Sequence, residues 1–172
     1  MAITIIGYRG TGKTTVGAEL AQRLDWDYID IDPELEKRAR KSIAAIFAQD
    51  GEPYFRDLES AELARHLTGE TIVVSAGGGV ILRDLNRDLM CKSGPVIWLM
   101  ADEATIAARI QSDPTSATRR PSLTRTDPIS EIQQVLAFRR PLYSAAATIQ
   151  VQTDGRSPAA IVDEIMLQLP RD

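Results

Sequence analysis

The sequence predicts an α/β protein in which helices pack on both faces of a five-stranded parallel sheet, in a three-layer αβα arrangement. Short apolar runs alternate with longer amphipathic segments along the chain, as repeated strand–helix units do. A glycine-rich stretch separates the first run from the first amphipathic segment, which is the position of the first strand-to-helix turn in such folds. The length of 172 residues fits one domain, and we expect 1–172 to form a single unit without internal repeats.

The predicted strands are short runs rich in β-branched or aromatic side chains, bounded by polar residues or glycine. A strand that is buried on both faces of a parallel sheet can be apolar throughout, so these runs need not alternate with polar residues. In order along the chain they are Ile3–Ile6, Tyr28–Ile31, Thr71–Ser75, Val96–Met100 and Ile149–Val151.

The predicted helices carry apolar residues at helical spacing. In Lys13–Leu24, for example, Val16, Leu20 and Leu24 lie four residues apart on one face. The other segments with such a stripe are Glu52–Leu67, Ala104–Ile110, Ile129–Arg139 and Pro158–Leu169.

One long segment, Ser112–Asp127, has no periodicity and is rich in Ser, Thr, Pro, Asp and Arg. A loop of this length inside a compact domain is typically either functional or disordered. We therefore predict a mobile lid over about 112–127, which would close over a bound ligand.

Composition and charge narrow the class of protein. The net charge of −4 argues against a general nucleic-acid binder, because affinity for the phosphate backbone requires many Lys and Arg residues. The single cysteine, Cys91, excludes an intramolecular disulfide and fits a reducing compartment. Met1 runs directly into an apolar stretch without a basic leader, and no apolar run is long enough to span a bilayer. We expect a soluble cytoplasmic monomer with small-molecule partners and neither nucleic-acid nor membrane partners.

A phosphate-binding loop is predicted at Gly7–Thr14, which matches the pattern G-x-x-x-x-G-K-[ST] between a predicted strand and a predicted helix. The glycines allow backbone N–H groups to turn inward onto phosphate oxygens, beside the positive end of the helix. Lys13 would reach the β- and γ-phosphates, and the hydroxyl of Thr14 would hold Mg²⁺. The alternative is a glycine-rich turn that binds nothing.

Two carboxylates, Asp30 and Asp32, follow the second predicted strand, with Pro33 directly after them. Pro33 suits the first position of a helix, so Asp32 could be simply its N-cap. Alternation along a strand would place both carboxylates on one side, at the same edge of the sheet as the phosphate loop. There one could lie near Mg²⁺ while the other orients an acceptor hydroxyl.

A glycine triplet, Gly77–Gly79, follows the third predicted strand and permits close approach of a ligand or of another backbone segment. Four arginines are candidates for the site: Arg56 on a predicted helix, Arg120 in the predicted lid, Arg139 at the end of a predicted helix, and Arg156 just before Pro158. The planar guanidinium group binds carboxylate or phosphate with two hydrogen bonds, although most arginines are ordinary solvated surface residues.

Together these motifs resemble the shikimate kinase family over nearly the whole chain. The phosphate loop alone indicates only a superfamily, whereas the further motifs appear in the family's order. They are Gly10–Thr15, Asp30 with Asp32, Ile46-Phe47, Gly51-Glu52, Phe55-Arg56, Gly77–Gly79, Arg120-Pro121, Arg139 with Pro141–Tyr143, and Arg156 with Pro158.

The resemblance implies that ATP, with Mg²⁺, phosphorylates the 3-hydroxyl of shikimate to give shikimate 3-phosphate, a step in aromatic amino-acid biosynthesis through chorismate. It implies a fold of the nucleoside-monophosphate-kinase type. It also implies catalytic roles for Lys13, Asp32 and Arg120 and metal contacts from Thr14 and Asp30. The implied ATP contacts are Gly10, Thr11, Gly12, Lys13, Thr14, Thr15, Arg109, Arg120, Arg156 and Pro158.

For shikimate, the resemblance implies that Arg56 and Arg139 bind the carboxylate, that Asp32 binds the hydroxyls, and that Gly78 brings backbone close. Glu59, one turn after Arg56, would hold that arginine in place. The full implied set is Asp32, Phe47, Phe55, Arg56, Gly77, Gly78, Gly79 and Arg139.

Some residues depart from the family's pattern. Gln152 stands before Thr153 where Asp is common, and Arg9 places a cation inside the phosphate loop. Two other functions stay open: a related small kinase acting on gluconate or a nucleotide, and an idle relative that senses a metabolite or binds a protein. Lys13, Thr14, Asp32 and Arg120 are all retained, which speaks against an idle relative.

Overall fold

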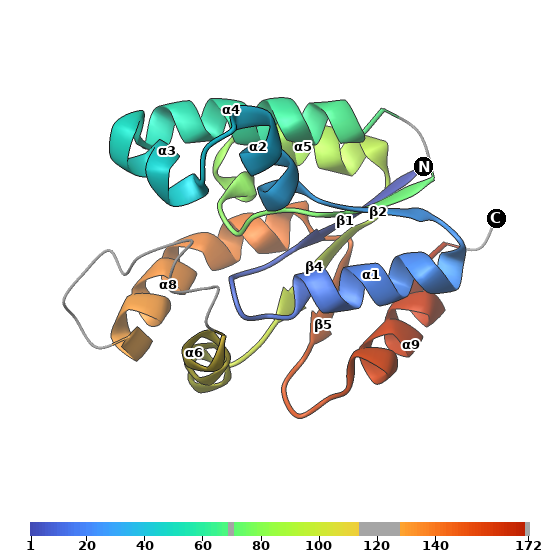
Figure 1. Cartoon of the computed structure of the whole chain (residues 1–172). Coiled ribbons are helices and arrows are strands. Elements are labelled where there is room, and N and C mark those ends of the chain that lie inside the picture. The colour runs from blue at the N-terminus through green and yellow to red at the C-terminus, as the bar shows by residue number, and fades with distance from the viewer. Residues whose placement is uncertain (69–70, 114–127, 171–172) are drawn as a thin grey trace.

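The computed structural model describes residues 1–68, 71–113 and 128–170. Its centre is a five-stranded sheet with the order β2-β3-β1-β4-β5, and every strand pair is parallel. Helices cover both faces (Figure 1), so the predicted fold class is confirmed. The strands are β1 (Ala2–Ile6), β2 (Asp27–Asp30), β3 (Ile72–Ser75), β4 (Val96–Met100) and β5 (Ile149–Gln152).

The helices agree with the prediction within a few residues for four segments, α1, α4, α6 and α9. Three further elements, α3, η1 and α5, were not predicted, and α2 was expected only as a helix that starts at Pro33. The described helices are α1 (Lys13–Leu24), α2 (Ile31–Ala39), α3 (Ile43–Gln49), α4 (Gly51–His66), the 3₁₀ helix η1 (Val80–Leu82), α5 (Asp84–Ser93), α6 (Glu103–Ser112), α8 (Pro128–Ala146) and α9 (Pro158–Gln168).

The core lies on both sides of β1, whose five residues are all buried. On one side, Ile3 and Ile5 pack against Leu20 of α1 and Ile165 of α9. On the other side, Ile6 belongs to a larger cluster that includes residues of α4, α5 and α8. This burial on both faces explains why β1 is apolar throughout. Figure 1 shows α1 and α9 together on one side of the sheet, with α4 and α5 on the other.

The start of α2 differs from the prediction. β2 ends at Asp30, and α2 begins at Ile31, with Asp30 as its N-cap. The Asp30 side chain accepts a hydrogen bond from the backbone N–H of Asp32 (3.2 Å), so the helix begins before Asp32. Asp32 is therefore a first-turn residue and not the cap, and the two carboxylates do not share one face of a strand. Pro33 still lies in the first turn, where its missing N–H costs nothing.

The end of α8 also differs from the prediction, which ended this helix at Arg139. The helix continues to Ala146 with Pro141 inside it. Proline removes one backbone hydrogen bond and usually breaks a helix. Here the following turn is fixed by burial, because Tyr143 and Ala146 lie in the core and Tyr143 stacks on Trp98 with 5.4 Å between ring centroids.

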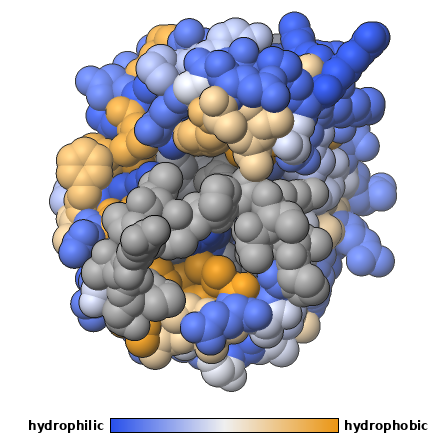
Figure 2. All heavy atoms as spheres, turned by 60° about the vertical axis from the view of Figure 1, so that its left-hand side comes forward, coloured by the Kyte–Doolittle hydropathy of each residue, from blue (hydrophilic) through white to orange (hydrophobic). Residues whose placement is uncertain are grey.

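The described surface is largely polar. In the space-filling view of the side carrying α3, α6 and α8, hydrophilic side chains predominate and hydrophobic ones form separate patches (Figure 2). In the part of the chain that the structure describes, none of the helices combines the length and the apolar character that crossing a bilayer requires.

Candidate active site

Three turns meet at one edge of the sheet. Gly7–Thr14 follows β1, the Asp30–Asp32 turn follows β2, and Gly77–Gly79 follows β3. The register places both Ile5 and Asp30 beside Ser75, so the three strands end side by side. Ligands of parallel sheets bind beyond this carboxyl edge, and most of the described site residues lie around it.

The phosphate loop has a backbone that favours glycine at three of its positions, Gly7, Gly10 and Gly12, which all have positive φ. Gly7 has φ +146°, and a Cβ there would lie 2.5 Å from the carbonyl oxygen of Leu99. Gly12, directly before α1, has φ +91°. The loop therefore places the N-terminus of α1 at the strand end, where its free N–H groups can bind an anion. Thr15 lies exposed in the first turn of this helix.

The side chain of Lys13 reaches back over the phosphate loop to Tyr8. Its Nζ donates a hydrogen bond to the carbonyl oxygen of Tyr8 (2.9 Å), which also accepts one from Oγ1 of Thr11 (2.8 Å). Gly10, within the loop, has φ +79°. The half-buried ammonium group is thus held over the loop, at the place where terminal phosphates would bind.

Thr14 and Asp30 form a pair of hard oxygen ligands. Oγ1 of Thr14 donates a hydrogen bond to Oδ2 of Asp30 (2.9 Å). Burial, together with the negative charge of Asp32, raises the pKa of Asp30 above its usual value, so a cation at this position would relieve an unfavourable charge. No group of three or more His, Cys, Asp or Glu side chains forms a metal cage among the described residues. The pair therefore fits Mg²⁺, which usually binds through one or two protein oxygens, substrate phosphates and water.

Arg56 of α4 is held by carboxylates on two sides. Its Nη1 donates to Oε2 of Glu59 (2.7 Å), as expected, and its Nη2 and Nε donate to Oε1 of Glu52 (2.9 and 3.1 Å). Burial alone would lower the pKa of Arg56, but the charges and hydrogen bonds of Glu59 and Glu52 raise it above the usual value. A Cβ at Gly79 would lie 2.3–2.6 Å from the guanidinium group, so any larger residue there would displace Arg56 from this position.

Arg139 of α8 reaches the same glycine turn. Its Nη1 donates to the carbonyl oxygen of Gly78 (3.1 Å), which also accepts from the hydroxyl of Tyr143 (2.5 Å). Gly79, the next residue, contacts Arg56. The turn therefore brings arginines from two distant helices to neighbouring residues. Gly77 lies before η1, and its carbonyl oxygen accepts a hydrogen bond from the N–H of Val80, the first residue of that helix (3.0 Å).

Two phenylalanines support this side of the site. Phe55 is fully buried in a small cluster with Leu35, Ile43 and Ile46, formed by α2, α3 and α4. Its ring lies 4.6 Å from that of Phe47, which is half-buried. Asp32, also half-buried, lies in the first turn of α2, three residues before Leu35 of this cluster.

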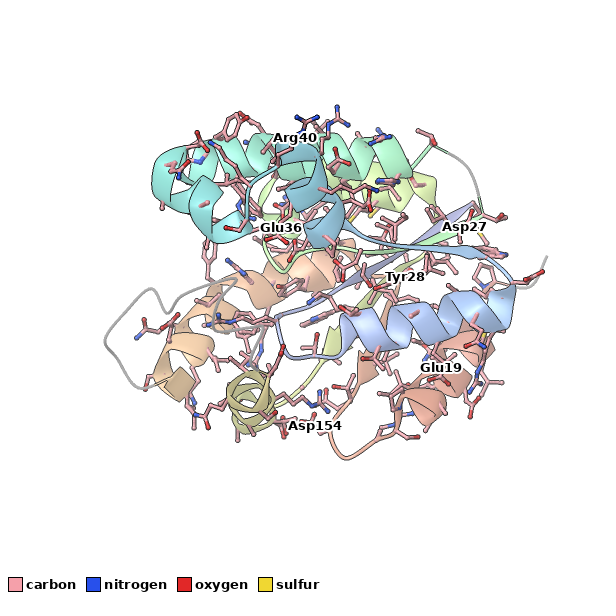
Figure 3. The ribbon with its side chains drawn as sticks, in the orientation of Figure 1. Glu19, Asp27, Tyr28, Glu36, Arg40 and Asp154 are labelled. Carbon is pink, nitrogen blue, oxygen red and sulfur yellow. The ribbon has the colours of Figure 1, made fainter. Side chains whose placement is uncertain are left out.

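Arg109, Arg156 and Pro158 lie on the other side of the phosphate loop. Arg109 donates to the carbonyl oxygen of Gly10 (3.2 Å) and to Oγ1 and the carbonyl oxygen of Thr153 (both 3.0 Å). Arg156 donates to the carbonyl oxygens of Gln152 (3.0 Å) and Ala160 (2.9 Å), and Pro158 begins α9. The contacts of Arg109 with Gly10 and Thr153 therefore join the phosphate loop to the β5–α9 loop, whose Asp154 is labelled in Figure 3.

Several contacts were not predicted from the sequence. Arg9 lies with its Nη2 4.0 Å from Oε1 of Glu131 on α8, which gives this loop cation a partner. Tyr28 packs against α1 (Figure 3), and a Cβ at Gly17 would lie 2.7 Å from its ring. Burial raises the pKa of Tyr28 to about 12. The contact between Glu52 and Arg56 had a signal in the sequence, since the two lie four residues apart in a predicted helix. Arg120 and the predicted lid lie outside the described residues, apart from Ser112 and Asp113.

Comparisons with known proteins identify the family that this geometry fits. A sequence model described as "Shikimate kinase" matches residues 9–170. A protein of Rhodopirellula baltica named shikimate kinase is 41% identical over 96% of this chain and 89% of its own length. One from Oleidesulfovibrio alaskensis is 42% identical over 97% of this chain and 95% of its own.

Among solved structures, the shikimate kinase of Acinetobacter baumannii in complex with shikimate matches with a TM-score of 0.89 and 30% identity. The match covers 96% of this chain and 90% of that one. A gluconokinase from Sinorhizobium meliloti matches with a TM-score of 0.63 but only 22% identity, which is a likeness of fold alone.

Proposed function

The chain belongs to the shikimate kinase family, and on that premise we propose how its own residues transfer the γ-phosphoryl group of ATP to the 3-hydroxyl of shikimate. The chain is a phosphotransferase with shikimate as acceptor and ATP and Mg²⁺ as co-substrate and cofactor. One observation carries the assignment of residues: the phosphate loop, the Asp30–Asp32 turn and the glycine triplet end at the same edge of the sheet.

ATP binds with its phosphates in the loop Gly7–Thr14 and its adenine toward Arg109, Arg156 and Pro158. The backbone N–H groups of the loop and the N-terminus of α1 bind the phosphate oxygens. Lys13 exchanges its contact with Tyr8 for the β- and γ-phosphates, where it stabilises charge in the transition state. Thr14 and Asp30 would hold Mg²⁺, which would supply positive charge beside the phosphates.

Shikimate binds between α2, α4 and α8. Its carboxylate binds Arg56 and Arg139, whose guanidinium groups both lie against the Gly78–Gly79 backbone. Asp32 accepts hydrogen bonds from the ring hydroxyls and orients the 3-hydroxyl toward the γ-phosphate. As the bond from the 3-hydroxyl oxygen to the γ-phosphorus forms and the bond from that phosphorus to the β–γ bridging oxygen breaks to release ADP, Asp32 accepts the hydroxyl proton.

Arg120 completes this assignment, although it lies outside the described residues. We assign it to the transferring phosphoryl group, and we assign 112–127 to a lid whose closure excludes water and so limits ATP hydrolysis. Loss of the Arg120 guanidinium should lower kcat without changing the affinity for shikimate.

An acceptor screen tests the function. Purified protein with Mg·ATP should form ADP with shikimate, and not with gluconate or nucleoside monophosphates, in a coupled assay. Gluconate-dependent turnover would favour the gluconokinase alternative. ATP binding without turnover on any of these acceptors would favour an idle relative.

The proposal also covers the oligomeric state and the cellular compartment of the protein. The chain is proposed to act as a single-domain monomer in the cytoplasm, and its single cysteine suits a reducing compartment. Light scattering at assay concentration should give the mass of one chain. A dimer mass would contradict the monomer.

A further inference from the structure

The guanidinium group of Arg56 has two carboxylate partners that differ in exposure. The side chain of Glu59 is fully buried, whereas that of Glu52 is 57% exposed. Glu52 lies in the first turn of α4, and Glu59 lies one turn after Arg56 inside the molecule. The two acids therefore hold the same cation from the interior and from the surface.

The other sides of Arg56 are closed by the protein. Gly79 lies directly against the guanidinium group, the ring of Phe55 lies 5.0 Å from its Cζ, and Glu59 binds Nη1. The remaining edge, formed by Nε and Nη2, donates both of its hydrogen bonds to one oxygen of Glu52. This edge is one that a carboxylate can bind through two parallel hydrogen bonds.

We propose that Glu52 sets the affinity and the acid specificity of the acceptor site, because its carboxylate occupies the edge of Arg56 that the acceptor's carboxylate takes. The inference rests on the assignment of Arg56 to that carboxylate, made above. Acceptor binding is then an exchange, in which an external carboxylate displaces the internal one. A neutral polyol has no carboxylate to replace that of Glu52 on Arg56, so the exchange favours acceptors that are acids.

The two contacts of Arg56 have different roles: Glu59 positions the guanidinium group, and Glu52 is exchanged for the carboxylate of the acceptor. Because Glu52 is 57% exposed, water screens its pairing with Arg56, which then contributes on the order of a two- to five-fold factor in an equilibrium constant, so Glu52 is displaced at small cost. The buried Glu59 keeps the guanidinium in place while Glu52 leaves. Opposite effects on acceptor affinity therefore follow from removing the two charges.

The experiment measures the Kd of shikimate by calorimetry, and KM and kcat for shikimate, at low ionic strength. Glu52→Gln should lower Kd and KM about two- to five-fold with kcat unchanged. Glu52→Asp should act in the same direction, because it keeps a charge at the helix N-terminus but lacks the length to reach Arg56. Glu59→Gln should raise Kd, because Arg56 loses its buried partner.

Glu34→Gln is the matched control. It removes an equal charge from α2, where Glu34 pairs only loosely with the exposed Lys37 (3.8 Å). This variant should leave Kd unchanged, which separates loss of the contact from a general change of electrostatic field. Melting curves of all four variants show that each is folded.

Shikimate methyl ester, which lacks the negative charge, separates this inference from the proposed function. Wild type should bind the acid more tightly than the ester, and Glu52→Gln should tighten the acid alone. If wild type favours the acid but Glu52→Gln leaves its Kd unchanged or raises it, the exchange is wrong and the proposed function stands. If wild type binds acid and ester equally, neither Arg56 nor Arg139 anchors the carboxylate, and the exchange fails together with that residue assignment, while the acceptor screen still tests the phosphoryl transfer.

Discussion

At the scale of single residues, the candidate site depends on charged side chains that are buried or half-buried, where a charge without a partner is unfavourable. Lys13 is held over the phosphate loop by the carbonyl oxygen of Tyr8. Asp30 is buried beside Asp32, which raises its pKa. Arg56 is buried too, but with carboxylates on two sides. Each charge lies where a ligand of opposite sign would bind. We therefore expect these residues to contribute more to ligand binding than to the stability of the fold.

The Lys13 ammonium is expected to act mainly in the transition state. Lys13→Met should lower kcat by about 10²–10³-fold, because a charge aimed at the transferring phosphate is lost. Met keeps the aliphatic length of this half-buried side chain, so the melting temperature should change little. Lys37→Met, at an exposed position on α2, is the control and should retain full activity. Near-normal turnover of Lys13→Met would refute the role of this lysine.

The raised pKa of Asp30 gives a prediction about pH. A carboxyl whose pKa is raised in the folded state favours folding when protonated, and this contribution is lost as pH rises through the folded pKa. Asp30→Asn should therefore raise the melting temperature of the ligand-free protein at pH 7, and the gain should vanish as pH falls toward the usual Asp value of about 4.

The same substitution should weaken Mg²⁺-dependent turnover, because Thr14 loses its charged partner. Asp27→Asn, at an exposed position on the same strand, is the control and should change neither property. A lower melting temperature for Asp30→Asn at pH 7 would show that the buried charge is not unfavourable.

At the scale of elements, the turn after β3 joins helices that are far apart in the sequence. Gly78 accepts hydrogen bonds from Arg139 and Tyr143 of α8, and Gly79 lies against Arg56 of α4. Pro141 inside α8 is tolerated because Tyr143 is fixed on the other side of it. The acceptor site therefore depends on the spacing of this turn.

Gly79→Ala tests that spacing. The added methyl group would lie 2.3–2.6 Å from the guanidinium of Arg56, which must move. KM for shikimate should rise about ten-fold or more, by the loss of one charge-assisted hydrogen bond, while KM for ATP changes little. Gly155→Ala, where nothing lies within 4 Å, should leave KM for shikimate unchanged. Equal effects of the two variants would show that only backbone strain or stability matters.

Arg139→Ala tests the contribution of α8. Removal of one of two arginines from the acceptor carboxylate should raise KM for shikimate about 10- to 100-fold. The affinity for ATP should stay within a factor of two or so, because Arg139 contacts the glycine turn and not the phosphate loop. A variant with altered KM for ATP alone would mean that the acceptor site is misplaced.

At the scale of the whole molecule, strand–helix alternation and the glycine-lysine motif were sufficient to predict the parallel sheet and the phosphate loop. The two helices that follow β2, α2 and α3, were harder to predict from the sequence. Ile31 reads as the end of a strand but begins α2, because Asp30 caps the helix. α3 has only seven residues and buries only Ile43 and Ile46, so its pattern is too short to detect.

The site was predicted mainly through motifs, and its contacts were not. The pairing of Arg9 with Glu131 joins residues far apart in sequence, as does that of Gly78 with Tyr143, and no local pattern encodes such contacts. The glycine triplet indicated close approach, but only the fold shows that Arg56 is what Gly79 approaches.

A structure of the complex with shikimate, Mg²⁺ and a non-hydrolysable ATP analogue tests the central claim most directly. The account predicts the terminal phosphorus about 3–3.5 Å from the 3-hydroxyl oxygen. That hydroxyl should lie beside Asp32, with Lys13 on the phosphate and the carboxylate on Arg56 and Arg139. A terminal phosphate pointing away from Asp32, or shikimate bound with its carboxylate toward the phosphate loop, would contradict it.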